Sequence, residues 1–99
     1  MTAFESIRDR VPQTELLAQL AEEASELAHA ALKLRRAYDG TNPTPVPAAE
    51  ALSNLKEEIA DVQLLVSVLG LNSLVCANER ACIMEAKLKR WLDRLGVDL

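Results

Sequence analysis

The chain is poor in the residues that usually build sheets, aromatic binding sites and flexible loops. Its 99 residues include one Phe, one Tyr, one Trp, three Gly and two Cys. Leucine and alanine, which are strong helix formers, predominate instead, so the composition favours an all-α fold over a sheet. No run approaches the roughly eighteen consecutive apolar residues of a membrane-spanning helix, so we expect no membrane partner.

An excess of positive charge is also missing. The formal net charge of -4 argues against a nucleic-acid polymer as the partner, because such binders are usually basic. A phosphate ligand remains compatible with this charge, since a metal ion can supply the positive charge. The first ten residues lack the apolar segment of a signal peptide, and Cys76 and Cys82 form no metal-binding pattern. We therefore expect a cytoplasmic protein whose cysteines are reduced and buried.

One proline-rich segment divides the chain. Residues 39–47 hold three prolines separated by single residues, which excludes a helix there. Long helices are predicted on either side, over residues 12–38 and 48–69, and a third follows Asn72 or Ser73 and ends near Leu95. Residues 1–12 form a short N-terminal segment. The expected fold is a single domain spanning residues 1–99, an antiparallel bundle of three long helices.

Each predicted helix carries an apolar stripe at the three- and four-residue spacing of a buried helix face. From Val62 onward the second helix is apolar almost all round, and one chain of this length offers too little surface to cover it. We therefore expect oligomerisation to complete the bundle. The stripes comprise Leu16, Leu20, Leu27, Ala30 and Leu34 in the first helix, Leu52, Leu55, Ile59, Val62, Val66 and Leu69 in the second, and Leu74, Ala77, Ala81, Met84, Leu88, Trp91 and Leu95 in the third.

A carboxylate interrupts the first stripe. Glu23 lies between Leu20 and Leu27, close to the axis of the apolar face, and Glu26 lies three residues further at its edge. An unpaired carboxylate on a core face costs several kcal/mol or has its pKa raised. The position of Glu23 therefore predicts a cationic partner.

The second helix repeats this arrangement. Glu58 and Asp61 are three residues apart, so they are neighbours on a face that continues into Leu65 and Val68. In an antiparallel pair both acidic motifs lie about four turns from the connecting loop, so they arrive at a similar height. Carboxylate oxygens suit Mg²⁺, for which Mn²⁺ could substitute. The predicted metal ligands are Glu23, Glu26, Glu58 and Asp61.

These motifs resemble those of a known family. Residues 20–28 (LAEEASELA) and 55–62 (LKEEIADV) resemble the EExxE…ExxD signature of the MazG-like nucleotide pyrophosphohydrolases, part of the all-α NTP pyrophosphatase superfamily. Residues 86–92 (AKLKRWL) are similar to a basic KxxR element of that family, whose Lys and Arg serve the substrate phosphates. The resemblance covers residues 13–95 and implies that role for Lys87 and Arg90.

The resemblance implies a reaction and an assembly. Family members hydrolyse a nucleoside triphosphate to the monophosphate and pyrophosphate with Mg²⁺, and they form dimers or tetramers with sites near the subunit interface. By that match, Glu23 or Glu26 would orient or deprotonate the attacking water. The expected partners are a (deoxy)nucleoside triphosphate and further copies of the chain, as a homodimer or homotetramer.

Two alternatives remain open. In a non-catalytic helical interaction module of the same fold, Glu23 would pair with an arginine or lysine and bind no metal. In a bundle that binds a transition metal, a di-iron site would draw on Glu-x-x-His pairs, and we disfavour this alternative because we expect no such pair. His29 is expected on the surface, opposite the carboxylates. Trp91 is expected to pack in a core or an interface.

Overall fold

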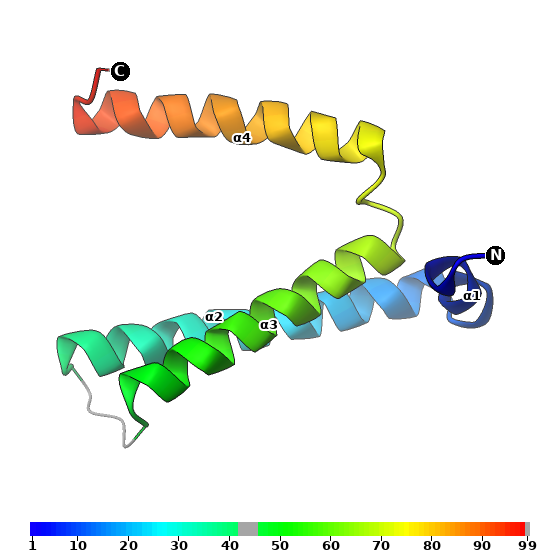
Figure 1. The fold of residues 1–99 in the computed structure, drawn as a ribbon, viewed down its shortest axis with the longest axis horizontal. Helices are drawn as coiled ribbons and strands as arrows, with labels where there is room; N and C mark the ends of the chain where they lie inside the picture. The colour runs from blue at the N-terminus through cyan, green and yellow to red at the C-terminus, as the bar shows by residue number, and fades with distance from the viewer. Residues whose placement is uncertain (42–45, 99) are drawn as a thin grey trace.

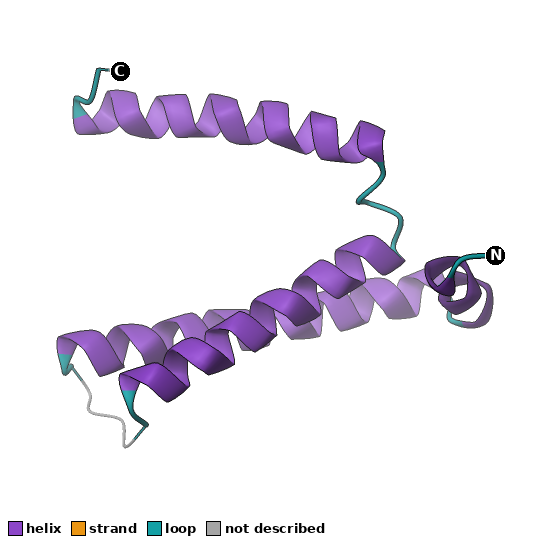
Figure 2. Cartoon of the chain, in the orientation of Figure 1, coloured by secondary structure: helices purple, strands orange, loops and turns teal. Residues whose placement is uncertain are grey.

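The described part of the chain contains four helices (Figure 1). The structure, a computed structural model, describes residues 1–41 and 46–98. The helices are α1 (Ala3–Arg10), α2 (Gln13–Asp39), α3 (Ala48–Val68) and α4 (Leu74–Leu95). Helices are the only regular secondary structure in this described part (Figure 2), which confirms the all-α prediction. The predicted boundaries of the long helices agree with the observed ones within one or two residues. Of the predicted proline-rich connection, residues 42–45 lie outside the described residues.

Side-chain caps explain where two helices begin. At the start of α1, the Glu5 amide donates to Thr2 Oγ1 at 3.1 Å and the Thr2 amide donates to Glu5 Oε2 at 2.9 Å. This capping box satisfies two amides that have no partner inside the helix. At the start of α4, the Cys76 amide donates to Ser73 Oγ at 3.2 Å. Ser73 is thus the cap, one of the two candidates that the sequence offered.

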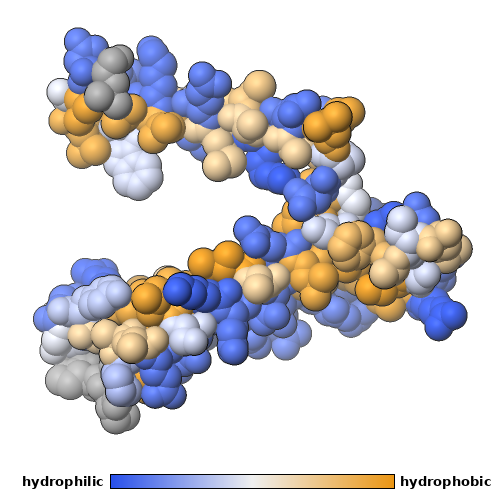
Figure 3. Space-filling view, viewed as in Figure 1, coloured by the Kyte–Doolittle hydropathy of each residue, from blue (hydrophilic) through white to orange (hydrophobic). Residues whose placement is uncertain are grey.

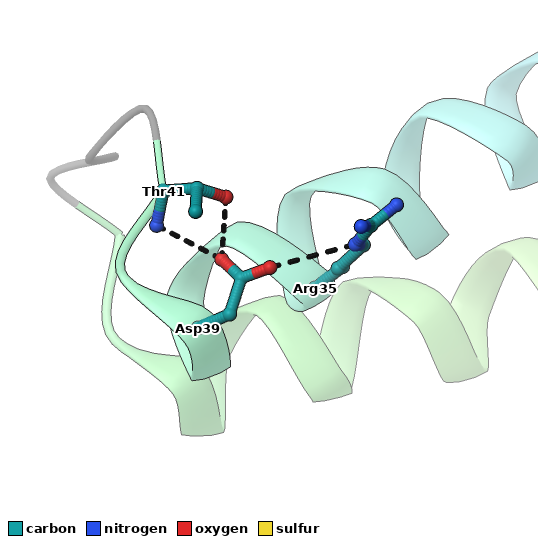
Figure 4. Close-up of polar contacts among 3 residues, drawn as sticks. All are labelled: Arg35, Asp39 and Thr41. Atoms are coloured by element: carbon teal, nitrogen blue, oxygen red, sulfur yellow. Dashed lines mark hydrogen bonds and ion pairs between the residues drawn. The ribbon is translucent and has the colours of Figure 1, made fainter.

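The end of α2 is held by a local polar network (Figure 4). Asp39 Oδ1 accepts hydrogen bonds from the Thr41 amide at 2.9 Å and the Thr41 hydroxyl at 2.6 Å, while Arg35 Nε lies 3.4 Å from Asp39 Oδ2. These bonds, with the hydroxyl bond contributing most, lower the pKa of Asp39. Gly40 follows with a φ of 70°, the left-handed conformation that stops a helix and suits glycine.

Helices α2 and α3 form an antiparallel hairpin, the packed part of the molecule (Figure 1). At its open end Leu16 packs with Leu65 and Val68 in a buried cluster. Short helix α1 lies against this end of α3, where Arg8 Nη1 donates to the Val68 carbonyl at 2.8 Å. Toward the connecting loop the buried residues are Ala30, Leu34 and Ala51. The acidic motifs therefore fall between two apolar regions of the hairpin.

The inner face of α3 differs from the predicted stripe. Leu65 and Val68 are buried, whereas Ile59, which we expected on the core face, is 40% exposed. The apolar face predicted for this helix was thus rotated away from the face that packs. Apolar residues surround the second half of α3, so periodicity alone left its orientation undetermined.

Helix α4 stands apart from the hairpin (Figure 1) and contains no buried residue. Apolar side chains therefore lie at its surface beside charged ones (Figure 3). The chain exposes 7662 Å² and has a Cα radius of gyration of 17.3 Å. A compact chain of this size would expose about 5,600 Å² and have a radius of about 12.6 Å. Two of the three long helices thus pack together within one chain, and the predicted stripe of the third is uncovered.

The position of α4 also decides the state of the cysteines. Neither is bonded, but Cys82 is exposed and Cys76 is only half-buried, so the prediction of two buried cysteines was wrong. Both lie on α4, which no other helix covers. Among the described residues, no helix combines the length and the apolar character needed to cross a membrane.

Candidate functional site

Three of the four predicted metal ligands meet in the middle of the hairpin. Carboxylate oxygens of Glu23 and Glu26 on α2 and of Glu58 on α3 lie within 4.8 Å of one another. The helical spacing places Glu23 and Glu26 one turn apart, and the antiparallel packing brings Glu58 opposite them. We call these three residues the acidic triad. Their convergence agrees with the matched heights that the sequence predicted.

Two oxygens of the acidic triad are buried without a hydrogen-bond partner among the described residues. They are Oε2 of Glu23 and Oε2 of Glu58. Burial raises the pKa of Glu23 to about 7, assisted by the charges of Glu26, Asp61 and Glu58. Burial and the charges of Glu26 and Asp61 also raise the pKa of Glu58. The site therefore holds carboxylates that resist ionisation in the absence of a cation.

The charge of the acidic triad is not balanced within the chain. In the described residues, no lysine, arginine or histidine forms an ion pair with Glu23, Glu26 or Glu58, and both observed ion pairs lie elsewhere. Three converging carboxylates that also carry two unsatisfied buried oxygens are suited to a hard divalent cation such as Mg²⁺. The residues present thus fit the cation that the sequence suggested.

Asp61, the fourth predicted ligand, lies close to the acidic triad but outside it. Its charge contributes to the raised pKa values of both Glu23 and Glu58. However, its oxygens do not belong to the group that lies within 4.8 Å. Its side chain is exposed, one turn further along α3 than Glu58. Asp61 is therefore placed to act at the edge of the site.

The predicted basic residues do not reach the acidic triad within one chain. Lys87 and Arg90 lie on α4, which does not pack against the hairpin. They line a separate surface hollow together with Trp91, Asp93 and Arg94. Trp91 is 61% exposed, so in the single chain it does not pack in a core.

A pocket of about 280 Å³ opens directly beside the acidic triad. Glu26 and Glu58 belong to both the acidic triad and the pocket wall. The other described residues of the wall, from α2, α3 and the segment before α3, are His29, Ala30, Lys33, Val46, Ala51, Asn54 and Glu57. We call this cavity the hairpin pocket.

His29 is exposed, as predicted, but it lies in the wall of the hairpin pocket, so its predicted position opposite the carboxylates was wrong. The prediction considered the direction of His29 relative to Glu23, whereas His29 lies only about 60° around the helix from Glu26. Lys33, seven residues after Glu26, falls within about 20° of it and was overlooked, as was Asn54. Both His29 and Lys33 could have been identified from the sequence by considering the side of the helix on which Glu26 lies.

The position of His29 also bears on the transition-metal alternative. Residues 26–29 (ELAH) are a Glu-x-x-His pair, so it was wrong to disfavour that alternative for want of one. Di-iron bundles, however, use two such pairs from different helices, and this chain has a single histidine. His29 does not belong to the group of ligand atoms that converge. One chain therefore presents an all-oxygen donor set.

Comparison of the chain with family models, curated protein sequences and solved structures found no match.

Proposed function

We propose that the protein is a Mg²⁺-dependent nucleoside triphosphate pyrophosphohydrolase with its active site at the acidic triad. The observation that carries the proposal is the convergence of Glu23, Glu26 and Glu58 with two buried oxygens that lack partners. Most acidic helix faces are solvated, and such carboxylates ionise without difficulty. Here the raised pKa of Glu23, about 7, indicates a cluster that favours a bound cation. The MazG-like motifs favour a nucleotide substrate.

The reaction consumes one water and breaks the bridge between the α- and β-phosphates, releasing the monophosphate and pyrophosphate. Bound Mg²⁺ would neutralise charge on the phosphate oxygens. Glu23 and Glu58, whose buried oxygens lack partners, would hold the cation. Glu26 is the exposed member of the acidic triad and also lines the hairpin pocket. Of the two glutamates considered, Glu26 is thus better placed to accept the proton of the attacking water.

We propose further that the protein acts as a homodimer or homotetramer in which α4 packs on another copy. Helix α4 carries five basic and three acidic residues, whereas α2 and α3 together carry nine acidic and four basic ones. These opposite charges favour association between α4 and a neighbouring hairpin. Lys87 and Arg90 do not reach the site of their own chain. In such an assembly they would contact substrate phosphates at the site of the neighbouring chain.

The test is Mg²⁺-dependent release of pyrophosphate from a panel of canonical and modified nucleoside triphosphates. At least one nucleotide should be hydrolysed, and chelation should stop the reaction. Glu58→Gln should abolish turnover while the far-UV circular dichroism stays unchanged. Glu22→Gln is the matched control, because Glu22 belongs to the same acidic run but is exposed and outside the acidic triad.

The competing proposal is a non-catalytic interaction module. The uncovered apolar stripe of α4, which includes Leu88 at 56% exposure and Trp91 at 61%, favours it. It predicts that no nucleotide is hydrolysed and that Mg²⁺ leaves the melting temperature unchanged. Both results together would replace the hydrolase proposal.

A further inference from the structure

The hairpin pocket has room for one part of a nucleotide beside the acidic triad. Its volume of about 280 Å³ is close to the lower end of the range of roughly 300–1,000 Å³ typical of small-molecule sites. It can therefore hold either the nucleoside part or a phosphate group of a nucleoside triphosphate. The chemistry of its wall indicates which part this is.

The two ends of the hairpin pocket differ in character. At one end, Glu26 and Glu58 are shared with the acidic triad, where a cation would hold the phosphates. Toward the connecting loop, Ala30, Val46 and Ala51 form the apolar part of the wall. A flat ring can contact these apolar atoms. A bare phosphate would meet three carboxylates, of Glu26, Glu57 and Glu58, against the single lysine Lys33.

Polar groups are also placed around this apolar wall. Asn54 on α3 forms no side-chain hydrogen bond with the described residues, and its amide offers both donors and an acceptor. That combination matches the edge of a nucleobase, which presents donors and acceptors side by side. His29 and Lys33, four residues apart on α2, add two further hydrogen-bonding groups from the other helix.

We infer that the hairpin pocket receives the nucleoside part of the substrate, and that Asn54 contacts the edge of the base. The inference rests on the proposed function, because the assignment of the phosphates to the acidic triad determines which end of the substrate enters the pocket. Asn54 is then a specificity-determining residue. Lys87 and Arg90 would contribute to phosphate binding and would not distinguish between bases.

The test compares nucleotide with pyrophosphate binding to the full chain by NMR in saturating Mg²⁺. The probes are α,β-imido deoxynucleoside triphosphates, which resist hydrolysis between these phosphates, and pyrophosphate. The side-chain amide signals of Asn54 should shift with the nucleotide and stay unchanged with pyrophosphate. Equal shifts with both probes would show that phosphate occupies the pocket and would overturn the inference.

Substitution supplies the second part of the test. Asn54→Ala should weaken binding of the preferred nucleotide about tenfold and reduce discrimination between bases, because a good base-edge contact contributes roughly five- to 150-fold. Its affinities for Mg²⁺ and pyrophosphate should be unchanged. Ser53→Ala, at the exposed neighbouring position outside the pocket wall, is the control and should bind every probe as the wild type does.

The remaining outcomes separate the inference from the proposed function. Nucleotide binding that leaves Asn54 unshifted and unaffected by substitution would overturn the inference alone. Binding of Mg²⁺ at the acidic triad with no nucleotide binding at all would overturn the proposed function, and the inference with it.

Discussion

Asp39 and Glu23, both on α2, have pKa values displaced in opposite directions. The charged form of Asp39 accepts two hydrogen bonds from Thr41 and faces Arg35, so ionisation is favoured. The charged form of Glu23 is partly removed from water, has an oxygen with no partner, and faces three other carboxylates. Helical position alone indicated that Glu23 was unusual, because it interrupts an apolar stripe.

The raised pKa of Glu23 predicts a pH-dependent stability. Its pKa is about 7 in the folded chain and 4.5 in the absence of these interactions. Between these values the unfolded chain releases the Glu23 proton while the folded chain retains it, so the free energy of unfolding should fall as pH rises through this window. Urea unfolding of the metal-free protein should show this fall, and Glu23→Gln should reduce it. The prediction would be contradicted if the free energy of unfolding fell equally steeply with pH in the wild type and in the variant.

The acidic triad also predicts unequal roles for the two α3 acids. Glu58 contributes an oxygen to the converging group and Asp61 does not, so Glu58→Gln should weaken Mg²⁺ binding more than Asp61→Asn. Calorimetric titration with Mg²⁺ would measure both, with Glu22→Gln as the unchanged reference. A larger loss for Asp61→Asn would show that Asp61 is the principal ligand on this helix.

At the scale of the elements, helix boundaries followed from local chemistry and helix orientation did not. Ser73, Gly40 and Pro47 mark ends that depend only on neighbouring residues. The inner face of α2 could also be predicted, because its apolar stripe is narrow and interrupted only by Glu23. The inner face of α3 could not, since apolar residues surround its second half.

The hairpin core gives a test of α2 orientation with adjacent residues. Leu16 is 3% exposed in the buried cluster, whereas Leu17 is 48% exposed. Leu16→Ala should lower the free energy of unfolding by about 2–5 kcal/mol, because it removes buried methyl groups and leaves a cavity. Leu17→Ala should cost much less. Chemical denaturation of both variants would compare them, and equal losses would mean that α2 packs through a different face.

At the scale of the whole molecule, the exposed surface exceeds that of a compact chain by about 2,000 Å². A typical stable interface buries about 1,200–2,000 Å² in total, so the excess is large enough to supply one. Much of it belongs to α4, where no residue is buried by the described part of the chain. Isolated helices of this kind are marginal in water, and tertiary packing normally stabilises them.

The uncovered stripe of α4 predicts self-association. Sedimentation velocity should show a dimer or tetramer, and Leu88→Gln should shift it toward the monomer, because the substitution places a polar group in the apolar interface. Lys89→Gln is the matched control, since the Lys89 side chain is 80% exposed and its ion pair within the described residues is with Asp93 on its own helix. A wild-type monomer at all concentrations would contradict the proposed assembly.

The sequence by itself determined that the chain is helical, where its helices begin and end, and which carboxylates on α2 and α3 are out of place. These properties depend on neighbouring residues and on helical periodicity. Only the tertiary structure decided that Glu23, Glu26 and Glu58 converge while Asp61 stands at the edge, and that His29, Lys33 and Asn54 line one pocket. It also left Lys87 and Arg90 apart from the site, on a helix whose apolar face is uncovered. Such relations depend on the rotation and packing of whole helices. A periodic pattern does not specify the rotation of a helix that apolar residues surround, and it does not show whether another helix of the chain covers an apolar face.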